Sequence, residues 1–423
     1  MEERIEKALL IGAELAKQEH INVSLEELEQ LALACDVEVV ATLTQRLDKV
    51  NPSTYVGAGK LQEAKVLLEQ FEANVVIFDD ELSPSQIRNI EAILECKVID
   101  RTILILDIFS KRAKTKEARL QVELAQMQYM LPRLVGLRQS LGRQVGGVGT
   151  TNRGAGETKL ELDRRKIEEK MVILKKELSR LVKQRQIQRE RRKKDGIPVV
   201  ALVGYTNAGK STLLNALLDM DVNLGEKKLV LEKNMLFATL ETAVRKVTLE
   251  KKRSFLLTDT VGFVHKLPHH LVQAFRSTLE EVKEADLLIH VVDYSNSAHE
   301  QHIKVTNDTL KEIGVEQVPM VYVFNKSDLV EKHFQWKDKG VIYVSAKEGT
   351  GFLELQEQLE QHLFYDDVEA EFLFPYSAGE LVAYFQQHAD VLEVKHDELG
   401  TYMKVLCRQK DFKKYKQFVK ENE

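Results

Sequence analysis

Four short segments in the second half of the chain have the residue types, order and spacing of a guanine-nucleotide site: residues 204–211, 259–262, 325–328 and 345–347. The first reads Gly-Tyr-Thr-Asn-Ala-Gly-Lys-Ser. In a loop of this type the backbone N–H groups wrap the phosphates, Lys210 reaches the β and γ oxygens, and the Ser211 hydroxyl ligates magnesium. An ordinary glycine turn can share this spacing by chance. The elements before and after the segment therefore decide between a phosphate-binding loop and an ordinary turn.

The setting is that of a strand, a loop and a helix. An apolar run at residues 197–203 precedes the loop, and the run Thr-Leu-Leu-Asn-Ala-Leu-Leu at 212–218 follows it with a helical pattern. Bound phosphate would then lie at a helix N-terminus, where unpaired N–H groups and the helix dipole favour an anion. We therefore predict a nucleotide phosphate site at this loop.

The base is predicted to be guanine. The Asp328 carboxylate can accept hydrogen bonds from both the N1 and the N2 donors of guanine, whereas adenine offers no such pair. Another apolar run ends at Asp259, which we expect to hold magnesium through water. The residues predicted to bind GTP or GDP are Gly204, Tyr205, Thr206, Asn207, Ala208, Gly209, Lys210, Ser211, Thr212, Asp259, Gly262, Asn325, Lys326, Asp328, Ser345, Ala346 and Lys347.

Hydrolysis is expected to involve Lys210, Gly262 and a threonine that senses the γ-phosphate. The candidate sensing segment is residues 236–242, and within it we choose Thr239, with Thr242 as the alternative, because a strand-like stretch follows. The predicted magnesium ligands are Ser211, Thr239 and, through water, Asp259.

Two further residues refine the chemistry. Many GTPases of the Ras type place a water-orienting glutamine where this chain has Phe263, so intrinsic hydrolysis should be slow and should depend on a partner. Phe263 could equally be a core residue. Asn207 lies three residues before Lys210, as in potassium-activated GTPases, and its amide is either a K⁺ ligand or a loop-stabilising group.

The whole-chain composition is that of a soluble globular protein. The 423 residues are 43% apolar and 30% charged, with a net charge of −5 and no apolar run long enough to span a bilayer. The acidic N-terminus lacks the pattern of a signal peptide, so we expect a cytoplasmic protein. The three separated cysteines show no metal-ligand spacing and are expected to be small core residues.

Two helices with apolar seams are predicted between residues 113 and 196. Between them, residues 136–157 are so rich in glycine that we expect no helix there. This pattern predicts an antiparallel hairpin with a flexible tip. The seam residues are Leu120, Leu124, Met127, Leu131 and Leu134 in the first helix and Ile167, Met171, Leu174, Leu178 and Leu181 in the second.

The hairpin also concentrates positive charge, with fifteen Lys or Arg residues between Thr158 and Lys194. This arm could neutralise nucleic-acid phosphates, or it could form a solvated face of ion pairs with the interleaved acidic residues. A tip rich in Gly and Arg suits irregular RNA, because guanidinium groups pair with phosphates and stack on bases; a plain linker is the alternative. The predicted RNA contacts are Arg138, Arg143, Gly146, Gly147, Gly149, Arg153, Gly154 and Gly156.

The predicted fold class is α/β multidomain. We expect a small α/β domain at 1–112, the hairpin at 113–196, a G domain with a mostly parallel sheet at 197–364, and a small α/β domain at 365–423 with one strand between two helices. Residues 55–60, Tyr-Val-Gly-Ala-Gly-Lys, resemble a second phosphate loop only weakly.

Two longer segments carry a resemblance more specific than the nucleotide motifs: residues 122–134, Val-Glu-Leu-Ala-Gln-Met-Gln-Tyr-Met-Leu-Pro-Arg-Leu, and residues 146–149 with 154–161. With them, essentially the whole chain resembles the HflX family of bacterial ribosome-associated GTPases. The resemblance implies that the N-terminal domain and hairpin dock on the large ribosomal subunit and its rRNA, the hairpin loop approaching the peptidyl transferase centre. It also implies a GTP-bound protein, expected to be monomeric, that splits stalled or idle ribosomes, with hydrolysis stimulated by the subunit.

The chain departs from the family pattern at the tip, where Thr151 and Asn152 are inserted, Ala155 replaces a proline and Lys159 a glutamine; Glu241-Thr242 also replaces an Asp-Pro-Thr. We therefore hypothesise a specialised paralogue that rescues antibiotic-stalled ribosomes. The alternatives are a GTP-dependent assembly factor, an RNA helicase that uses a second nucleotide in the N-terminal domain, and a metabolic phosphotransferase.

Overall fold

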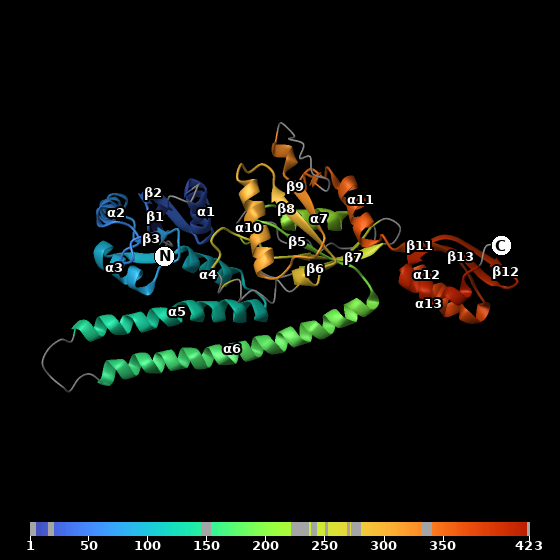
Figure 1. Cartoon of the computed structure of the whole chain (residues 1–423), viewed down its shortest axis with the longest axis horizontal. Coiled ribbons are helices and arrows are strands. Elements are labelled where there is room, and N and C mark those ends of the chain that lie inside the picture. The colour runs from blue at the N-terminus through green and yellow to red at the C-terminus, as the bar shows by residue number, and fades with distance from the viewer. Residues whose placement is uncertain are drawn as a thin grey trace, which may run out of the picture.

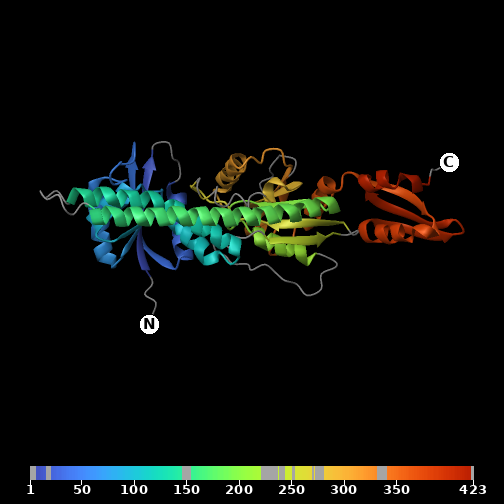
Figure 2. The ribbon, with the colours of Figure 1, turned by 90° about the horizontal axis from the view of Figure 1, so that it is seen from below.

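The computed structural model of the chain is an elongated α/β protein, with three separate sheets along its length and a long helical hairpin beneath the first two (Figure 1). The view from below shows the two hairpin helices side by side (Figure 2). The structure describes residues 6–15, 21–144, 154–220, 237, 243–249, 253–268, 271, 281–330 and 341–420, with the backbone alone at 135–144, 154–160, 188–195 and 243. The predicted α/β multidomain class is confirmed.

The N-terminal unit is a four-stranded parallel sheet in the order β2-β1-β3-β4. Helices α1 and α4 pack on one face, and α2 and α3 on the other. Ser83 begins α3 with a capping box to Gln86, and the Asp100 carboxylate caps α4. The elements are β1 (Glu6–Leu15), α1 (Ile21–Ala34), β2 (Val37–Leu47), α2 (Ala58–Phe71), β3 (Val75–Phe78), α3 (Pro84–Leu94), β4 (Lys97–Asp100) and α4 (Arg101–Arg112).

The hairpin consists of α5 (Lys116–Gln144) and α6 (Gly154–Asp195), which pack along each other. Leu124 and Leu174, from the two predicted seams, are buried. The expectation that residues 136–157 are not helical is wrong at both ends, since α5 continues to Gln144 and α6 starts at Gly154. Glycine lowers helix stability by only about 1 kcal/mol per residue, so neighbouring turns can carry it.

The central unit is a six-stranded sheet in the order β10-β9-β8-β5-β7-β6, parallel except for the β6–β7 pair. Helices α7 and α11 pack on one face and α10 on the other. The strands are β5 (Val199–Val203), β6 (Ala243–Thr248), β7 (Ser254–Asp259), β8 (Leu287–Asp293), β9 (Met320–Asn325) and β10 (Val341–Tyr343); the helices are α7 (Lys210–Asp219), α10 (His299–Glu312), η2 (Ser327–Leu329) and α11 (Phe352–Leu363).

The C-terminal unit has more strands than we predicted. Two strands, not one, lie between its two α-helices, and a third precedes them; all three form an antiparallel sheet in the order β11-β13-β12. Strand β12 is mostly exposed, which weakens the apolar alternation that signals a strand. The elements are β11 (Asp367–Phe374), η3 (Tyr376–Ala378), α12 (Gly379–His388), β12 (Asp390–Asp397), β13 (Gly400–Arg408), α13 (Gln409–Lys414) and η4 (Lys416–Phe418).

The N-terminal and central units share a hydrophobic core. Val122 and Tyr129 of α5 pack in the same cluster as Phe109 of α4, and Phe237 and Val264 of the central unit complete it. The hairpin base is therefore fixed to both units. Within the described part of the chain, no helix combines the length and the apolar character needed to cross a membrane.

Candidate functional site

The predicted phosphate loop lies between β5 and α7, at the carboxyl edge of the central sheet. The buried Lys210 ammonium donates hydrogen bonds to the carbonyl oxygens of Gly204, at 3.1 Å, and Tyr205, at 2.8 Å. Burial lowers the pKa of Lys210 to about 8, and the nearby Asp259 carboxylate partly offsets this shift. Phosphate oxygens would stabilise the ammonium form, so the loop centre suits a polyanion.

Two glycines of the site lie where no side chain fits. Gly209 has φ of +90°, and a Cβ there would lie 2.2 Å from Nδ2 of Asn325. A Cβ on Gly262 would lie 2.7 Å from Cα of Thr206 and 3.0 Å from Nζ of Lys210. The chain thus brings the second and third predicted segments into direct contact with the phosphate loop.

Asn325 connects three of the predicted segments. Its Nδ2 donates to the carbonyl oxygen of Ala208, and its Oδ1 accepts from the Ala346 N–H, both at 3.0 Å. The Asp328 carboxylate accepts from the Ser345 hydroxyl at 2.6 Å. These bonds hold Asp328 at the edge of the sheet, in the place where we predicted recognition of the base.

The two lysines of these segments lie differently. Lys326 forms an ion pair with Asp293, at the end of β8, at 2.7 Å. The Lys347 side chain is 80% exposed and points to Glu348, so the structure does not bring it into the cluster.

Two of the three predicted magnesium ligands, Ser211 and Asp259, meet at the start of α7. Ser211 Oγ donates to Asp259 Oδ2 at 2.9 Å. A hydroxyl and a carboxylate are the hard oxygen donors that Mg²⁺ prefers, so this pair fits the ion. Thr239 and its alternative Thr242 lie outside the described residues.

The described residue closest in sequence to Thr239 is Phe237, which contacts both units. Its N–H donates to Oγ1 of Thr206 in the phosphate loop at 3.0 Å. Its ring packs edge-on against Phe109 of α4, with 4.6 Å between centroids. Phe237, which belongs to the segment that we expect to sense the γ-phosphate, therefore lies beside the N-terminal unit.

Phe263 is a core residue, as one of our two interpretations predicted. Its ring is 2% exposed and packs in the cluster beneath α10. Its backbone is paired with the phosphate loop, since its N–H donates to the Gly204 carbonyl and its own carbonyl accepts from the Thr206 N–H. Asn207 is exposed, with φ of +60°, a conformation that asparagine tolerates; its side chain makes no hydrogen bond with a described residue.

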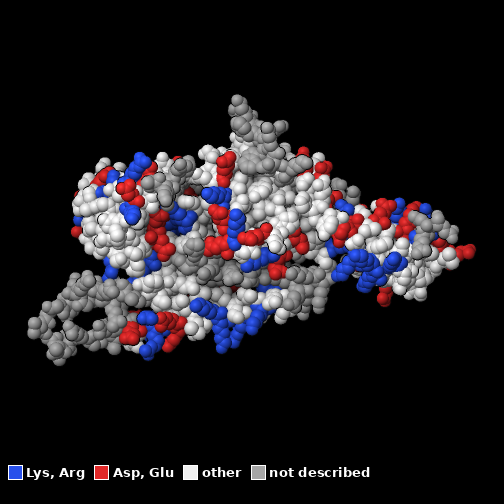
Figure 3. Space-filling model, viewed as in Figure 1, with Lys and Arg blue, Asp and Glu red and all other residues white. Residues whose placement is uncertain are grey.

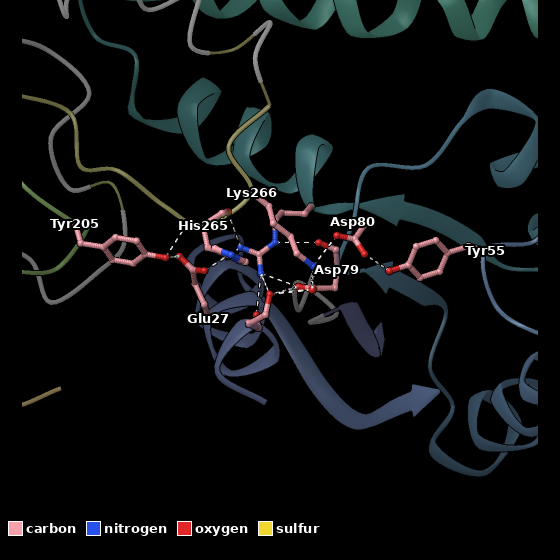
Figure 4. A network of polar contacts seen from close by, with 9 residues as sticks. Glu27, Tyr55, Asp79, Asp80, Tyr205, His265 and Lys266 are labelled. Atoms are coloured by element: carbon pink, nitrogen blue, oxygen red, sulfur yellow. Dashed lines mark hydrogen bonds and ion pairs between the residues drawn. The ribbon is translucent and has the colours of Figure 1, made fainter. Parts of the chain in front are cut away.

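A network of polar contacts joins the phosphate loop to the N-terminal unit (Figure 4). The Tyr205 hydroxyl donates to a carboxylate oxygen of Glu27 on α1 at 2.7 Å, and it accepts from the His265 N–H at the same distance. The Tyr205 ring also stacks on His302 of α10 at 3.8 Å. One side chain of the phosphate loop thus contacts α1, α10 and the segment after Gly262.

The centre of this network is Arg101, the first residue of α4, which is 1% exposed. It pairs with Asp79 at 2.7 Å and Glu27 at 3.0 Å, and it donates to the His265 carbonyl at 3.1 Å. Lys266 forms ion pairs with Asp79 and Asp80. Burial alone would raise the pKa of Asp79, but Arg101 and Lys266 outweigh it and hold the pKa at about 2.

The sequence patterns did not predict this network of polar contacts around Arg101. One signal was present, because Asp79 and Asp80 directly follow a buried strand, at the edge of a parallel sheet where binding sites form. That edge is occupied by Lys266 from the central unit. The weak second phosphate loop nearby is also engaged, since Gln45 accepts from the Gly57 N–H at 2.8 Å and Lys60 pairs with Glu63 at 2.7 Å.

The ion pairs of the hairpin support one of the two interpretations of its charge, the ion-paired face, while RNA binding stays a prediction. Arg164 pairs with Glu168 at 2.9 Å, and Arg185 and Lys170 pair with carboxylates of α5, so part of α6 is an ion-paired face. Of the predicted RNA contacts, Arg138 and Arg143 lie on α5 and Gly154 and Gly156 on α6. Those outside the described residues are Gly146, Gly147, Gly149 and Arg153.

Comparison with known proteins agrees with this geometry. Family models described as GTP-binding GTPase N-terminal, GTP-binding GTPase Middle Region and 50S ribosome-binding GTPase match residues 22–110, 112–192 and 199–326. GTPase HflX of Caldanaerobacter subterraneus subsp. tengcongensis is 46% identical over 408 residues, 96% of this chain and 92% of that protein. The chain belongs to the HflX family of GTPases.

A second relative and a solved structure are similar over most of the chain at lower identity. GTPase HflX of Escherichia coli K12 is 38% identical, over 90% of this chain and 88% of that protein. A crystal structure of a GTP-binding protein from Sulfolobus solfataricus in complex with GDP has 25% identity and a TM-score of 0.44, covering 85% of this chain and 99% of that one. As an HflX-family P-loop GTPase, the chain is a GTP hydrolase, as its motifs predicted.

Proposed function

We propose that this HflX-family GTPase binds the large ribosomal subunit through its N-terminal unit and hairpin, and splits stalled or idle ribosomes when GTP is bound. It acts as a monomer in the cytoplasm. One observation carries the proposal: the base of a long hairpin is packed into a core that also contains residues of the GTPase unit. A rearrangement at the nucleotide can therefore be transmitted to the hairpin through rigid packing.

The residues of the site have the following roles in this proposal. Lys210 and the phosphate-loop N–H groups bind the phosphates, Asp328 reads guanine, and Gly262 and Thr239 sense the γ-phosphate. Ser211, Thr239 and, through water, Asp259 would hold Mg²⁺, which would supply positive charge to neutralise the phosphates. The buried phenyl ring of Phe263 cannot orient the attacking water as a glutamine would, so in this proposal the ribosomal subunit completes the arrangement for hydrolysis.

Potassium is part of the same proposal, with the exposed Asn207 amide as its ligand beside the phosphates. Turnover of GTP should be faster in potassium than in sodium chloride at equal concentration, and Asn207→Ala should remove that difference. Equal rates of the unaltered protein in both salts would contradict this role.

The main experiment measures GTP turnover by the full chain, alone and with purified large subunits, followed by light scattering of joined ribosomes. Subunits should stimulate turnover strongly, and GTP should cause splitting. Lys210→Ala should abolish both, whereas Lys304→Ala, at an exposed position of α10, should change neither. Turnover that subunits do not stimulate would overturn the ribosomal proposal while leaving the GTPase assignment intact.

The inserted tip residues give the proposal a finer part, the rescue of antibiotic-stalled ribosomes. A longer tip reaches further toward the peptidyl transferase centre. Deleting Thr151 and Asn152 should lower resistance to lincosamide or macrolide drugs while GTP turnover stays the same. Unchanged resistance after the deletion would remove the drug-rescue role.

A GTP-dependent assembly factor remains the second candidate, because RNA binding by the hairpin serves it equally well. It would bind free or immature large subunits and leave joined ribosomes intact. The helicase alternative has little physical support, because Lys266 of the central unit occupies the edge of the N-terminal sheet where a nucleotide would bind, and pairs there with Asp79 and Asp80.

A further inference from the structure

Positive charge is concentrated at the end of the C-terminal unit. The segment from Arg408 to Lys420 contains six Lys or Arg residues and a single carboxylate, that of Asp411. The preceding residues 366–407 contain two lysines and nine carboxylates. The basic segment therefore differs sharply in charge from the acidic sheet on which it packs.

The lysines of this segment face solvent, and none of them forms an ion pair with a carboxylate of a described residue. The two lysines of the neighbouring strands behave differently, since Lys404 pairs with Glu369, and Lys395 with Glu393. Five cations on a short segment thus leave their charge available to an external anion. They are Lys410, Lys413, Lys414, Lys416 and Lys420.

The apolar residues of the same segment are already used within the fold. Phe412, Tyr415 and Phe418 pack against the core of the C-terminal unit, and the Phe418 ring lies 5.4 Å from that of Phe374. A membrane-binding surface needs apolar side chains that enter the bilayer beside its lysines. Because these rings point inward, the charge pattern favours a polyanion in water over a lipid surface.

A second basic segment ends beside this one. Helix α6 ends at Asp195, and the sequence of its last turns includes Arg189-Glu-Arg-Arg-Lys-Lys194. Arg408 contacts the chain directly after that helix, since a Cβ on Gly196 would lie 2.8 Å from its Nη1. Figure 3 shows Lys and Arg side chains gathered on the C-terminal unit where it approaches the end of α6.

We propose that the lysines of Arg408–Lys420 form a second RNA-binding surface that contacts backbone phosphates of the large-subunit rRNA. The inference rests on the proposed ribosomal function and adds a contact far from the hairpin tip. Several exposed ammonium groups on one segment match the repeated phosphates of an RNA backbone better than they match a single anionic group. It should increase affinity without reading sequence.

The test compares two double variants of the full chain with equal loss of charge. Lys413→Gln with Lys416→Gln alters the proposed surface, and Lys395→Gln with Lys404→Gln alters the paired lysines of the same unit. With a non-hydrolysable GTP analogue bound, their affinities for purified large subunits and for naked large-subunit rRNA are measured over a salt series. The first variant should lose about tenfold in affinity at roughly 0.1 M salt, and its salt slope should fall by about 1.5, since each of the two phosphate contacts contributes about 0.7–0.9.

The control variant should bind within about twofold of the unaltered protein, and both variants should unfold at its melting temperature. Equal affinities and slopes for the two variants would overturn the proposal. Binding to vesicles containing anionic lipid is measured in parallel. If the first variant lost affinity only for the vesicles, the surface would be assigned to membranes and the proposal would also be overturned. If the unaltered chain does not bind subunits, the ribosomal function fails instead. Binding to naked rRNA then still decides whether these lysines contact RNA.

Discussion

Replacing Arg101 by methionine tests the polar network that joins the two units. Methionine keeps much of the side-chain volume but removes a buried cation that makes hydrogen bonds to Ser24, Asp79, Glu27 and the His265 carbonyl. Removing one partner of a buried ion pair costs about 3–5 kcal/mol. We expect the lower end, about 3 kcal/mol, because Asp79 keeps its bond from Ser24 and its ion pair with Lys266.

The pKa of Asp79 gives an independent magnitude. It is lowered from 3.8 to about 2, which at about 1.4 kcal/mol per pKa unit corresponds to about 2.5 kcal/mol of stability. Because the pKa of the folded form lies below that of the unfolded form, this stability is fully present above pH 4 and is lost as the pH falls toward 2. In Arg101→Met the pKa of Asp79 should rise toward its unfolded value. The Asp79 carboxylate should then contribute less stability at pH 7 as well as at pH 4.

The assay is urea unfolding of the full chain, followed by far-UV circular dichroism at pH 7 and at pH 4. Arg101→Lys should lie between the two proteins, since an ammonium keeps the charge but not the planar set of donors. Arg165→Met, at an exposed position of α6, should change stability by less than about 0.5 kcal/mol. A cost below about 1 kcal/mol for Arg101→Met would refute the view that this network holds the units together.

Three further predictions concern the nucleotide. Asp328→Asn should weaken GTP binding by about 3 kcal/mol, the value of one or two hydrogen bonds to a charged group, and should improve binding of xanthosine triphosphate. If fluorescence titrations showed an unchanged preference for GTP over xanthosine triphosphate, Asp328 would be excluded as the residue that reads the base. Gly262→Ala should lower GTP turnover at least about tenfold, because its Cβ forces the Thr206 backbone or the Lys210 ammonium to move; phosphate release at the normal rate would contradict this contact. Above its pKa of about 8, Lys210 must take up a proton to bind phosphate. Calorimetry of GTP binding at pH 8.5, in two buffers with different ionisation enthalpies, should therefore show proton uptake that is reduced in Lys210→Arg. Equal proton uptake by the two proteins would be evidence against this role of Lys210.

Local patterns account for the parts that the sequence predicted well. The phosphate loop is a strand, a loop and a helix within about twenty residues, so its spacing alone specifies its geometry. The hairpin seams at Leu124 and Leu174 follow the helical period, which needs no knowledge of the rest of the chain. The C-terminal strands were missed because β12 is exposed and lacks a clear alternation.

The sequence by itself determined that the chain is a GTPase, because the residues predicted to meet phosphate, magnesium and guanine lie in short contiguous motifs at strand ends. Only the tertiary structure decided how that site is connected to the rest of the molecule. Arg101 lies 164 residues before His265, and Glu27 lies 178 residues before Tyr205. A buried charge signals that a partner is needed, but it cannot identify that partner until packing brings distant segments together.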